Sequence, residues 1–132
     1  MITEISVTIQ FWGNNFSPKS VEDATGINFD RKVEVGDIGD TGKYKGKPIP
    51  YGSASLDAPK YIKDDDKILW LANLLKGKIE RMYDFGLEQA HFYIGYFYED
   101  QCNCTLTREE LKAISDLEID FWFSCYDQSE DK

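Results

Sequence analysis

The residues best suited to binding chemistry lie in a glycine- and lysine-rich segment, residues 36–50, with four glycines and three lysines. Glycines let backbone N–H groups converge on an anion, and lysines add positive charge, so this segment could hold a phosphate or a carboxylate. Its spacing differs from the phosphate loop that ends in Gly-Lys followed by Ser or Thr. A solvated surface loop is the other interpretation. The ligand-binding candidates are Gly42, Lys43, Lys45, Gly46 and Lys47.

Three cysteines, Cys102, Cys104 and Cys125, form the second reactive group. If the strands that precede Cys102 and contain Cys125 are parallel, all three thiols lie near one end of the sheet. A metal or redox role is then one interpretation, but zinc normally takes four ligands at spacings such as C-x-x-C, and the single histidine, His91, lies far along the strand. Unreactive thiols are the other interpretation. We expect no metal and no cofactor.

The sequence shows no pattern that predicts catalysis. His91 has no placed Ser, Cys or carboxylate beside it in the sequence, and general acid–base catalysis needs a second positioned group. Paired acidic residues, among them Glu109 and Glu110, are explained by helix N-termini or by solvated surfaces. We therefore expect no catalytic residues.

A surface on the predicted second helix is a candidate for partner binding. Trp70, Leu74 and Arg81 lie away from the apolar stripe of that helix. A solvent-facing Trp is either covered by other segments or serves as an anchor, because Trp and Arg dominate interface hot spots. Self-association through Trp70 and Leu74 is a further possibility.

The distribution of charge suggests a second partner surface. The net charge is −9, which opposes binding to a nucleic-acid backbone. Residues 99–132 carry ten acidic side chains against three basic ones. Glu109, Glu110 and Asp116 belong to this acidic third, which would attract a basic protein.

The elements that must position these residues alternate between strands and helices. Alternating residues predict strands at 4–12, 29–35 and 119–125, and a further strand is predicted at 51–56. Residues 91–98 are apolar or aromatic at both positions of the alternation, which predicts a central strand that is covered on both faces or has a large aromatic outer face. Ser17-Pro18 begins a short helix that Gly26 ends, and a longer helix follows Asp64 to Asp66 and runs to Gly86. A capping box, Thr107 with Glu110, begins the last helix, with Leu106 and Leu111 as a hydrophobic staple.

This order predicts an α+β fold in one domain over residues 1–132. We expect a ferredoxin-like βαββαβ core with an added C-terminal α-β unit, its mixed sheet covered by helices. Helix faces marked by Tyr83 and by Leu111, Ile114 and Leu117 should be buried. Residues 36–50 form a long loop and residues 126–132 a polar tail.

Three segments together resemble an uncharacterised bacterial family, domain of unknown function 4279. They are SPKSVEDATGI after the first strand, the Leu-rich helix around LWLANLL, and the ending LTREELKAISDLEIDFWFSCYD. The resemblance covers nearly the whole chain. It implies a small bacterial α+β protein and supplies no catalytic residues for these positions.

The expected location is the cytoplasm. No stretch approaches the ~20 apolar residues of a membrane-spanning helix, and MITEISVTIQ shows no export signal. An odd number of cysteines is typical of reduced thiols.

The leading hypothesis is a non-catalytic protein-binding module, for example an immunity-type inhibitor of a basic toxin. The alternative is a small anionic-ligand-binding protein or an enzyme that uses the Gly/Lys loop. Neither nucleic acid nor a membrane is an expected partner, and homo-oligomers are compatible with the sequence.

Overall fold

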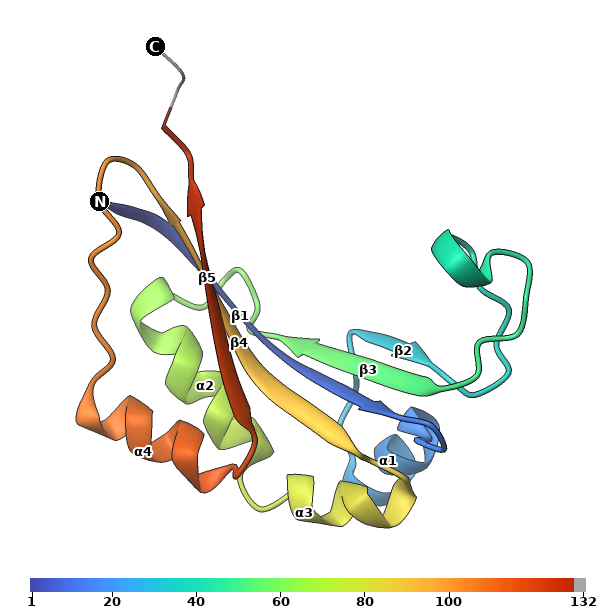
Figure 1. Ribbon diagram of the computed structural model, residues 1–132. Helices are drawn as coiled ribbons and strands as arrows, with labels where there is room; N and C mark the ends of the chain where they lie inside the picture. Colours follow the sequence, from blue (N-terminus) through green and yellow to red (C-terminus); the bar gives the residue numbers. More distant parts are fainter. Residues whose placement is uncertain (130–132) are drawn as a thin grey trace. The chain divides into compact units, whose positions relative to one another are not determined.

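The computed structural model describes residues 1–129, which form an α+β fold on a mixed five-stranded sheet (Figure 1). The sheet order is β2-β3-β1-β4-β5. In the described part of the chain, the strands are β1 (Ile2–Gly13), β2 (Arg31–Val33), β3 (Gly52–Asp57), β4 (Gln89–Tyr98) and β5 (Asp120–Asp127). The α-helices there are α1 (Pro18–Thr25), α2 (Lys67–Leu75), α3 (Ile79–Met82) and α4 (Arg108–Asp116).

The predicted α+β class and the alternation of strands and helices are confirmed. β2 pairs antiparallel with β3, and β4 pairs parallel with β5. The sheet is mixed, as predicted, but β2 has only three residues and the topology is not a clear ferredoxin-like one.

The residues group into two compact units, which we describe separately. The first unit contains residues 1–9, 57–76 and the chain from residue 91 onward, and the second contains residues 10–56 and 77–90. That the whole chain is a single domain remains a prediction.

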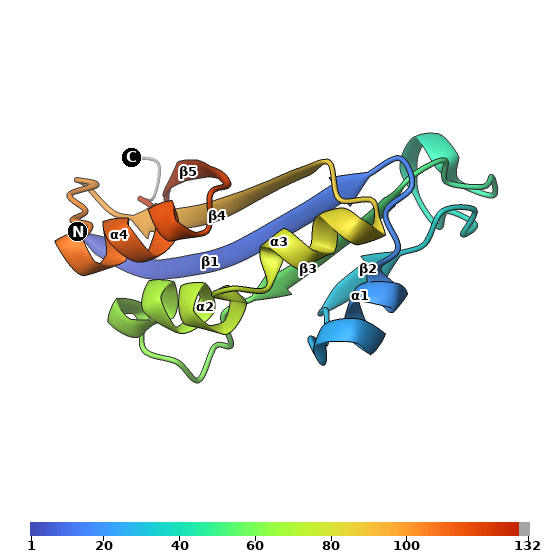
Figure 2. The same cartoon turned by 90° about the horizontal axis from the view of Figure 1, so that it is seen from below.

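Two helices cover the buried side of the first unit's strands. The predicted alternation in β1 is confirmed, since Val7 and Ile9 are buried, and Phe92 and Ile94 are buried in β4. α2 packs against α4, and both lie on the same side of the strands (Figure 2). Each fully buried Leu or Ile side chain stabilises the fold by about 1.5–3 kcal/mol. The buried Leu and Ile side chains of the two helices are Ile68, Leu71, Leu75 and Ile114.

The capping box at the start of α4 is confirmed. Thr107 Oγ1 accepts the Glu110 N–H at 3.1 Å, and Glu110 Oε1 accepts the Thr107 N–H at 2.8 Å. Ile114 and Leu117 are buried as predicted. The prediction that Leu111 is buried is wrong, because the residue is 50% exposed. The buried side of α4 contains Glu110 together with Ile114, and Leu111 lies outside it.

β5 runs two residues further than predicted, so the polar tail cannot begin at residue 126. Tyr126 continues the strand because its ring stacks on Phe97, with centroids 4.9 Å apart, and its hydroxyl hydrogen-bonds to the hydroxyl of Tyr93 at 2.5 Å. Residues 128 and 129 have no regular structure, and the rest of the predicted tail, 130–132, lies outside the described residues.

The predicted long helix up to Gly86 is also wrong. The chain turns at residues 76–78, where Gly77 has a φ of +75°, a value that side chains other than glycine rarely adopt. The helix therefore divides into α2 and α3, and a 3₁₀ turn precedes Gly86. Tyr83, expected on the buried stripe, is 50% exposed.

In the second unit, the predicted helix α1 is confirmed. Ser17 Oγ accepts the Ser20 N–H at 3.3 Å, and Gly26 ends the helix with a φ of +77°. The following strand is shorter than predicted, since Val35 is exposed and the chain turns where the Asp37 side chain accepts the Glu34 N–H.

Replacing Thr107 with Ala should lower the free energy of unfolding by about 1 kcal/mol, because the capping box loses a side-chain acceptor. Urea unfolding followed by circular dichroism measures this. Thr41 is the matched control, since it precedes a 3₁₀ turn without a side-chain capping bond, and Thr41→Ala should have a smaller effect. Equal losses in both variants would contradict the capping role.

Candidate functional site

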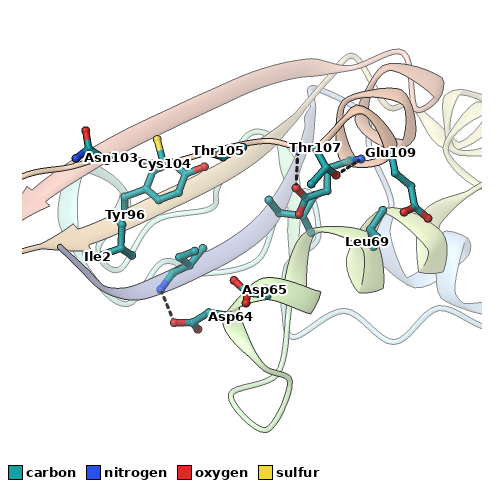
Figure 3. A pocket seen from close by; sticks show the side chains of 13 residues that line it. Ile2, Asp64, Asp65, Leu69, Tyr96, Asn103, Cys104, Thr105, Thr107 and Glu109 are labelled. Atoms are coloured by element: carbon teal, nitrogen blue, oxygen red, sulfur yellow. Dashed lines mark hydrogen bonds between the residues drawn. The ribbon is translucent and has the colours of Figure 1, made fainter.

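A cavity of about 570 Å³ lies within the first unit (Figure 3). Its size falls in the range typical of small-ligand pockets, roughly 300–1,000 Å³. The start of β1, the start of α2, the segment after β4 and the start of α4 supply its walls. The apolar part of the lining consists of Ile2, Ile5, Ile68 and Leu69.

Four carboxylates also line the cavity: Asp64, Asp65, Glu109 and Glu110. The first of them is neutralised by a buried lysine. Lys67 Nζ lies 2.8 Å from Asp64 Oδ1 and donates to the Ile5 carbonyl at 2.6 Å, while Asp64 Oδ2 accepts the Ile5 N–H at 3.2 Å. Only 7% of the Lys67 side chain is exposed, so this contact fixes the start of α2 against β1.

The other acidic side chains differ in their partners. Glu110 is 7% exposed and accepts the Thr107 N–H in the capping box. Asp65 and Glu109 are exposed, and within residues 1–129 neither forms an ion pair. Their charges therefore face the cavity uncompensated, and the wall is negative overall. Figure 3 shows Glu109 beside Leu69, so charge and apolar surface adjoin each other.

Tyr96 reaches the cavity from β4. The residue is only 3% exposed. Burial raises the pKa of its phenol to about 12, and Cys104, Glu110 and Cys102 contribute in the same direction. The phenol is therefore a neutral group in the wall at physiological pH.

The three thiols were predicted to lie near one end of the sheet if the two strands run parallel, and β4 and β5 do pair parallel. Cys102 Sγ lies 3.3 Å from Cys125 Sγ, and Cys104 lines the cavity beside Tyr96. In the described part of the chain, no group of three or more His, Cys, Asp or Glu residues is arranged to hold a metal ion.

His91 takes part in a stacked pair. Its ring lies 3.9 Å from that of Trp122 at an interplanar angle of 9°, and its buried Nε2 has no hydrogen-bond partner among the described residues. Burial lowers its pKa, opposed by the charge of Asp120. The His91 ring therefore packs on the Trp122 ring across the paired strands β4 and β5.

Comparison of the chain with family models, curated proteins and solved structures gives no match. The resemblance to domain of unknown function 4279 therefore remains a prediction. Among the described residues, no helix combines the length and the apolar character needed to cross a membrane.

The structure brings only some of the predicted partner-binding residues together. Glu109 and Glu110 both line the cavity, while Asp116 lies at the far end of α4 and pairs with Lys112 at 3.4 Å. Trp70 and Leu74 are half-buried in α2, and Arg81 is exposed in α3, which belongs to the second unit.

The Gly/Lys loop uses several of its backbone donors internally. The Lys45, Gly46 and Lys47 N–H groups donate to the carbonyls of Gly42, Gly39 and Tyr44. These amides are therefore occupied. The side chains of Lys43, Lys45 and Lys47 are exposed, and Lys43 Nζ lies 5.5 Å from the centre of the Tyr44 ring. Anion binding by Gly42, Lys43, Lys45, Gly46 and Lys47 remains a prediction.

Half of the acidic wall, Asp64 and Asp65, lies outside the candidate residues named from the sequence. Asp64 and Asp65 were interpreted only as favourable charges at a helix N-terminus, and Tyr96 only as part of an aromatic strand. The available signal was the surplus of carboxylates at two helix starts, at residues 64–66 and 109–110. That the two starts share a cavity follows from the packing of α2 on α4.

Replacing Tyr96 with Phe tests whether the fold raises the pKa of the Tyr96 phenol. Because the folded-state pKa of about 12 exceeds the ordinary value of about 10, the folded protein holds this proton more tightly than the unfolded chain. The free energy of unfolding should therefore fall between about pH 10 and about pH 12, and Tyr96→Phe should lose less over this range. Urea unfolding at about pH 9 and about pH 11.5 measures the difference. Identical losses in both proteins would contradict the assignment.

Proposed function

We propose that this protein is a non-catalytic protein-binding module whose acidic cavity receives a lysine or arginine side chain of a basic partner. The observation that carries the proposal is the pair of exposed carboxylates, Asp65 and Glu109, beside apolar wall residues in a cavity of about 570 Å³. Such a site matches a side chain with an aliphatic stem and a cationic end.

The chemistry of the wall favours a cation over an anion. The stem of a lysine or arginine would lie along Ile68 and Leu69, and its charged end would lie between Asp65 and Glu109. A phosphate or carboxylate would meet like charge at the same place and be repelled. The neutral phenol of Tyr96 adds a hydrogen-bonding group without changing the charge.

The surface around the cavity supports a protein partner over a small cation. α4 carries exposed Glu109 and Asp116 at its two ends, and the acidic side chains of residues 99–132 outnumber the basic ones. This field would accelerate the approach of a basic protein at low salt. An immunity-type inhibitor of a basic toxin is one form of this function. Anion binding at the Gly/Lys loop has weaker support, because three of its amides are already occupied.

We also propose that the first four strands form a ferredoxin-like core, with α4 and β5 as an added unit. The support is the order β4-β1-β3-β2, in which β1 and β3 are the inner strands. Membership of the domain of unknown function 4279 family is proposed on the sequence segments alone.

Affinity capture with a matched charge control tests the function. The cavity variant combines Asp65→Lys with Glu109→Lys, and the control combines Glu80→Lys with Asp84→Lys in the second unit, so both change the net charge equally. Wild type and control should retain the same basic protein, released as salt screens the attraction, and the cavity variant should lose it. Circular dichroism checks that all three baits are folded.

Equal retention by the cavity variant and the control would refute the cavity as the binding site. Retention that does not depend on salt would refute the electrostatic basis.

A further inference from the structure

Two of the three cysteine side chains meet across the parallel strand pair. The Cys102 thiol donates to Cys125 Sγ, with the sulfurs 3.3 Å apart, although 23 residues separate them in the sequence. Cys125 of β5 lies opposite Tyr96 of β4 in the strand pairing, and Cys102 lies in the segment that follows β4. Since a disulfide has an S–S distance of about 2.05 Å, the sulfurs need to approach by only about 1 Å to bond.

The backbone around the pair holds the two thiols in this position. The Glu99 N–H donates to the Met1 carbonyl at 2.9 Å, and the Met1 ammonium donates to the Glu99 carbonyl at 2.6 Å. On the other side, the Gln128 N–H donates to the Tyr98 carbonyl at 2.7 Å. The residue after β4 is therefore tied to the N-terminal residue, and the residue after β5 is tied to the end of β4, so the segments that flank both cysteines are held by backbone hydrogen bonds.

The environments of the two thiols give them different roles. Cys125 is exposed and its sulfur accepts the hydrogen bond from Cys102, whereas Cys102 is half-buried and holds its proton in that hydrogen bond. The hydrogen bond with Cys125, together with burial and the charges of Cys125 and Cys104, raises the pKa of the Cys102 thiol to about 11. Because a thiolate is the attacking species, Cys125 is suited to react first and Cys102 second.

We propose that Cys102 and Cys125 form a reversible modification site that a low-molecular-weight disulfide, such as glutathione disulfide, oxidises to an intramolecular disulfide. The Cys125 thiolate attacks one sulfur of glutathione disulfide, forms a mixed disulfide and releases one glutathione thiolate. Cys102 then loses its proton to solvent, attacks the Cys125 sulfur and releases the second glutathione. Two protein thiols are oxidised and one glutathione disulfide is reduced, so electrons and atoms balance.

The disulfide would restrain a wall of the acidic cavity. Asn103, Cys104 and Thr105 directly follow Cys102 and line that cavity. A bond from Cys102 to β5 limits the movement of this segment, so oxidation changes how readily the wall adapts to an occupant. The modification itself does not depend on the proposed function, whereas its effect on partner binding rests on it.

Non-reducing peptide mapping tests the site directly. The fully reduced protein is equilibrated with excess glutathione disulfide at about pH 8, where exchange is efficient, then acid-quenched, alkylated and digested with trypsin. Cleavage after Arg81, Arg108 and Lys112 separates the peptide with Cys102 and Cys104 from the peptide with Cys125. We expect one crosslink, between Cys102 and Cys125, with Cys104 alkylated and the crosslink reversed by dithiothreitol.

Two variants distinguish the cysteine that reacts first from the cysteine that closes the disulfide, and one further measurement tests the effect on the cavity wall. Cys104→Ser should form the same crosslink, and Cys102→Ser should stop at glutathione attached to Cys125. In the oxidised wild type, the amides of residues 103–105 should exchange hydrogen more slowly than in the reduced protein. A crosslink that uses Cys104, a stable mixed disulfide in the wild type, or three free thiols at equilibrium would overturn the proposal. Failure of the proposed function would leave the crosslink intact and only remove the captured partner.

Discussion

Two neighbouring strands can run parallel only if the chain returns along the full length of the first strand before the second begins. In this protein the constraint applies to β4 and β5, which pair in register from His91 with Asp120 to Tyr98 with Asp127. The return passes through residues 99–119 and contains α4, which packs against α2. Because both strands end at the same edge, Cys102 and Cys125 meet there, and the returning segment with α4 forms one wall of the acidic cavity.

The net charge of the cavity depends on which of its carboxylates form an ion pair or a helix cap. Asp64 is held by buried Lys67, and Glu110 closes the capping box of α4. Both charges are thereby used in fixing the ends of the helices. Asp65 and Glu109, their neighbours in the sequence, are exposed beside apolar side chains. At each of the two helix starts, one carboxylate has a partner within the fold and the carboxylate next to it in the sequence has no ion-pair partner within residues 1–129. The carboxylates without such a partner form a negative surface on the two helices, which suits recognition of a cationic side chain.

Local signals predicted much of the fold. The Thr107 capping box, the Ser17 start and Gly26 end of α1, and the alternation in β1 all reflect contacts between residues close in sequence, which a single sequence records. The turn at Gly77 was missed because an apolar stripe continues through it. Exposed Leu111 was missed because tertiary packing, and not helix periodicity, selects the buried side. The cavity itself was not predicted. Glu109 and Glu110 were named as partner-binding candidates from the charge distribution, whereas Asp65 and Tyr96 lie beside them in the cavity lining only through strand pairing and helix packing.

We propose above that the cavity accepts the cationic end of a lysine or arginine. The most direct measurement is an amide NMR titration of the full chain with acetyl-Gly-Lys-Gly-amide, compared with the same peptide carrying an acetylated lysine. We expect the charged peptide to shift the amide signals of Asp65, Leu69 and Glu109, with shifts that salt reduces, and the neutral peptide to cause no shifts of comparable size. Equal shifts with both peptides, or shifts confined to residues outside the cavity lining, would contradict it.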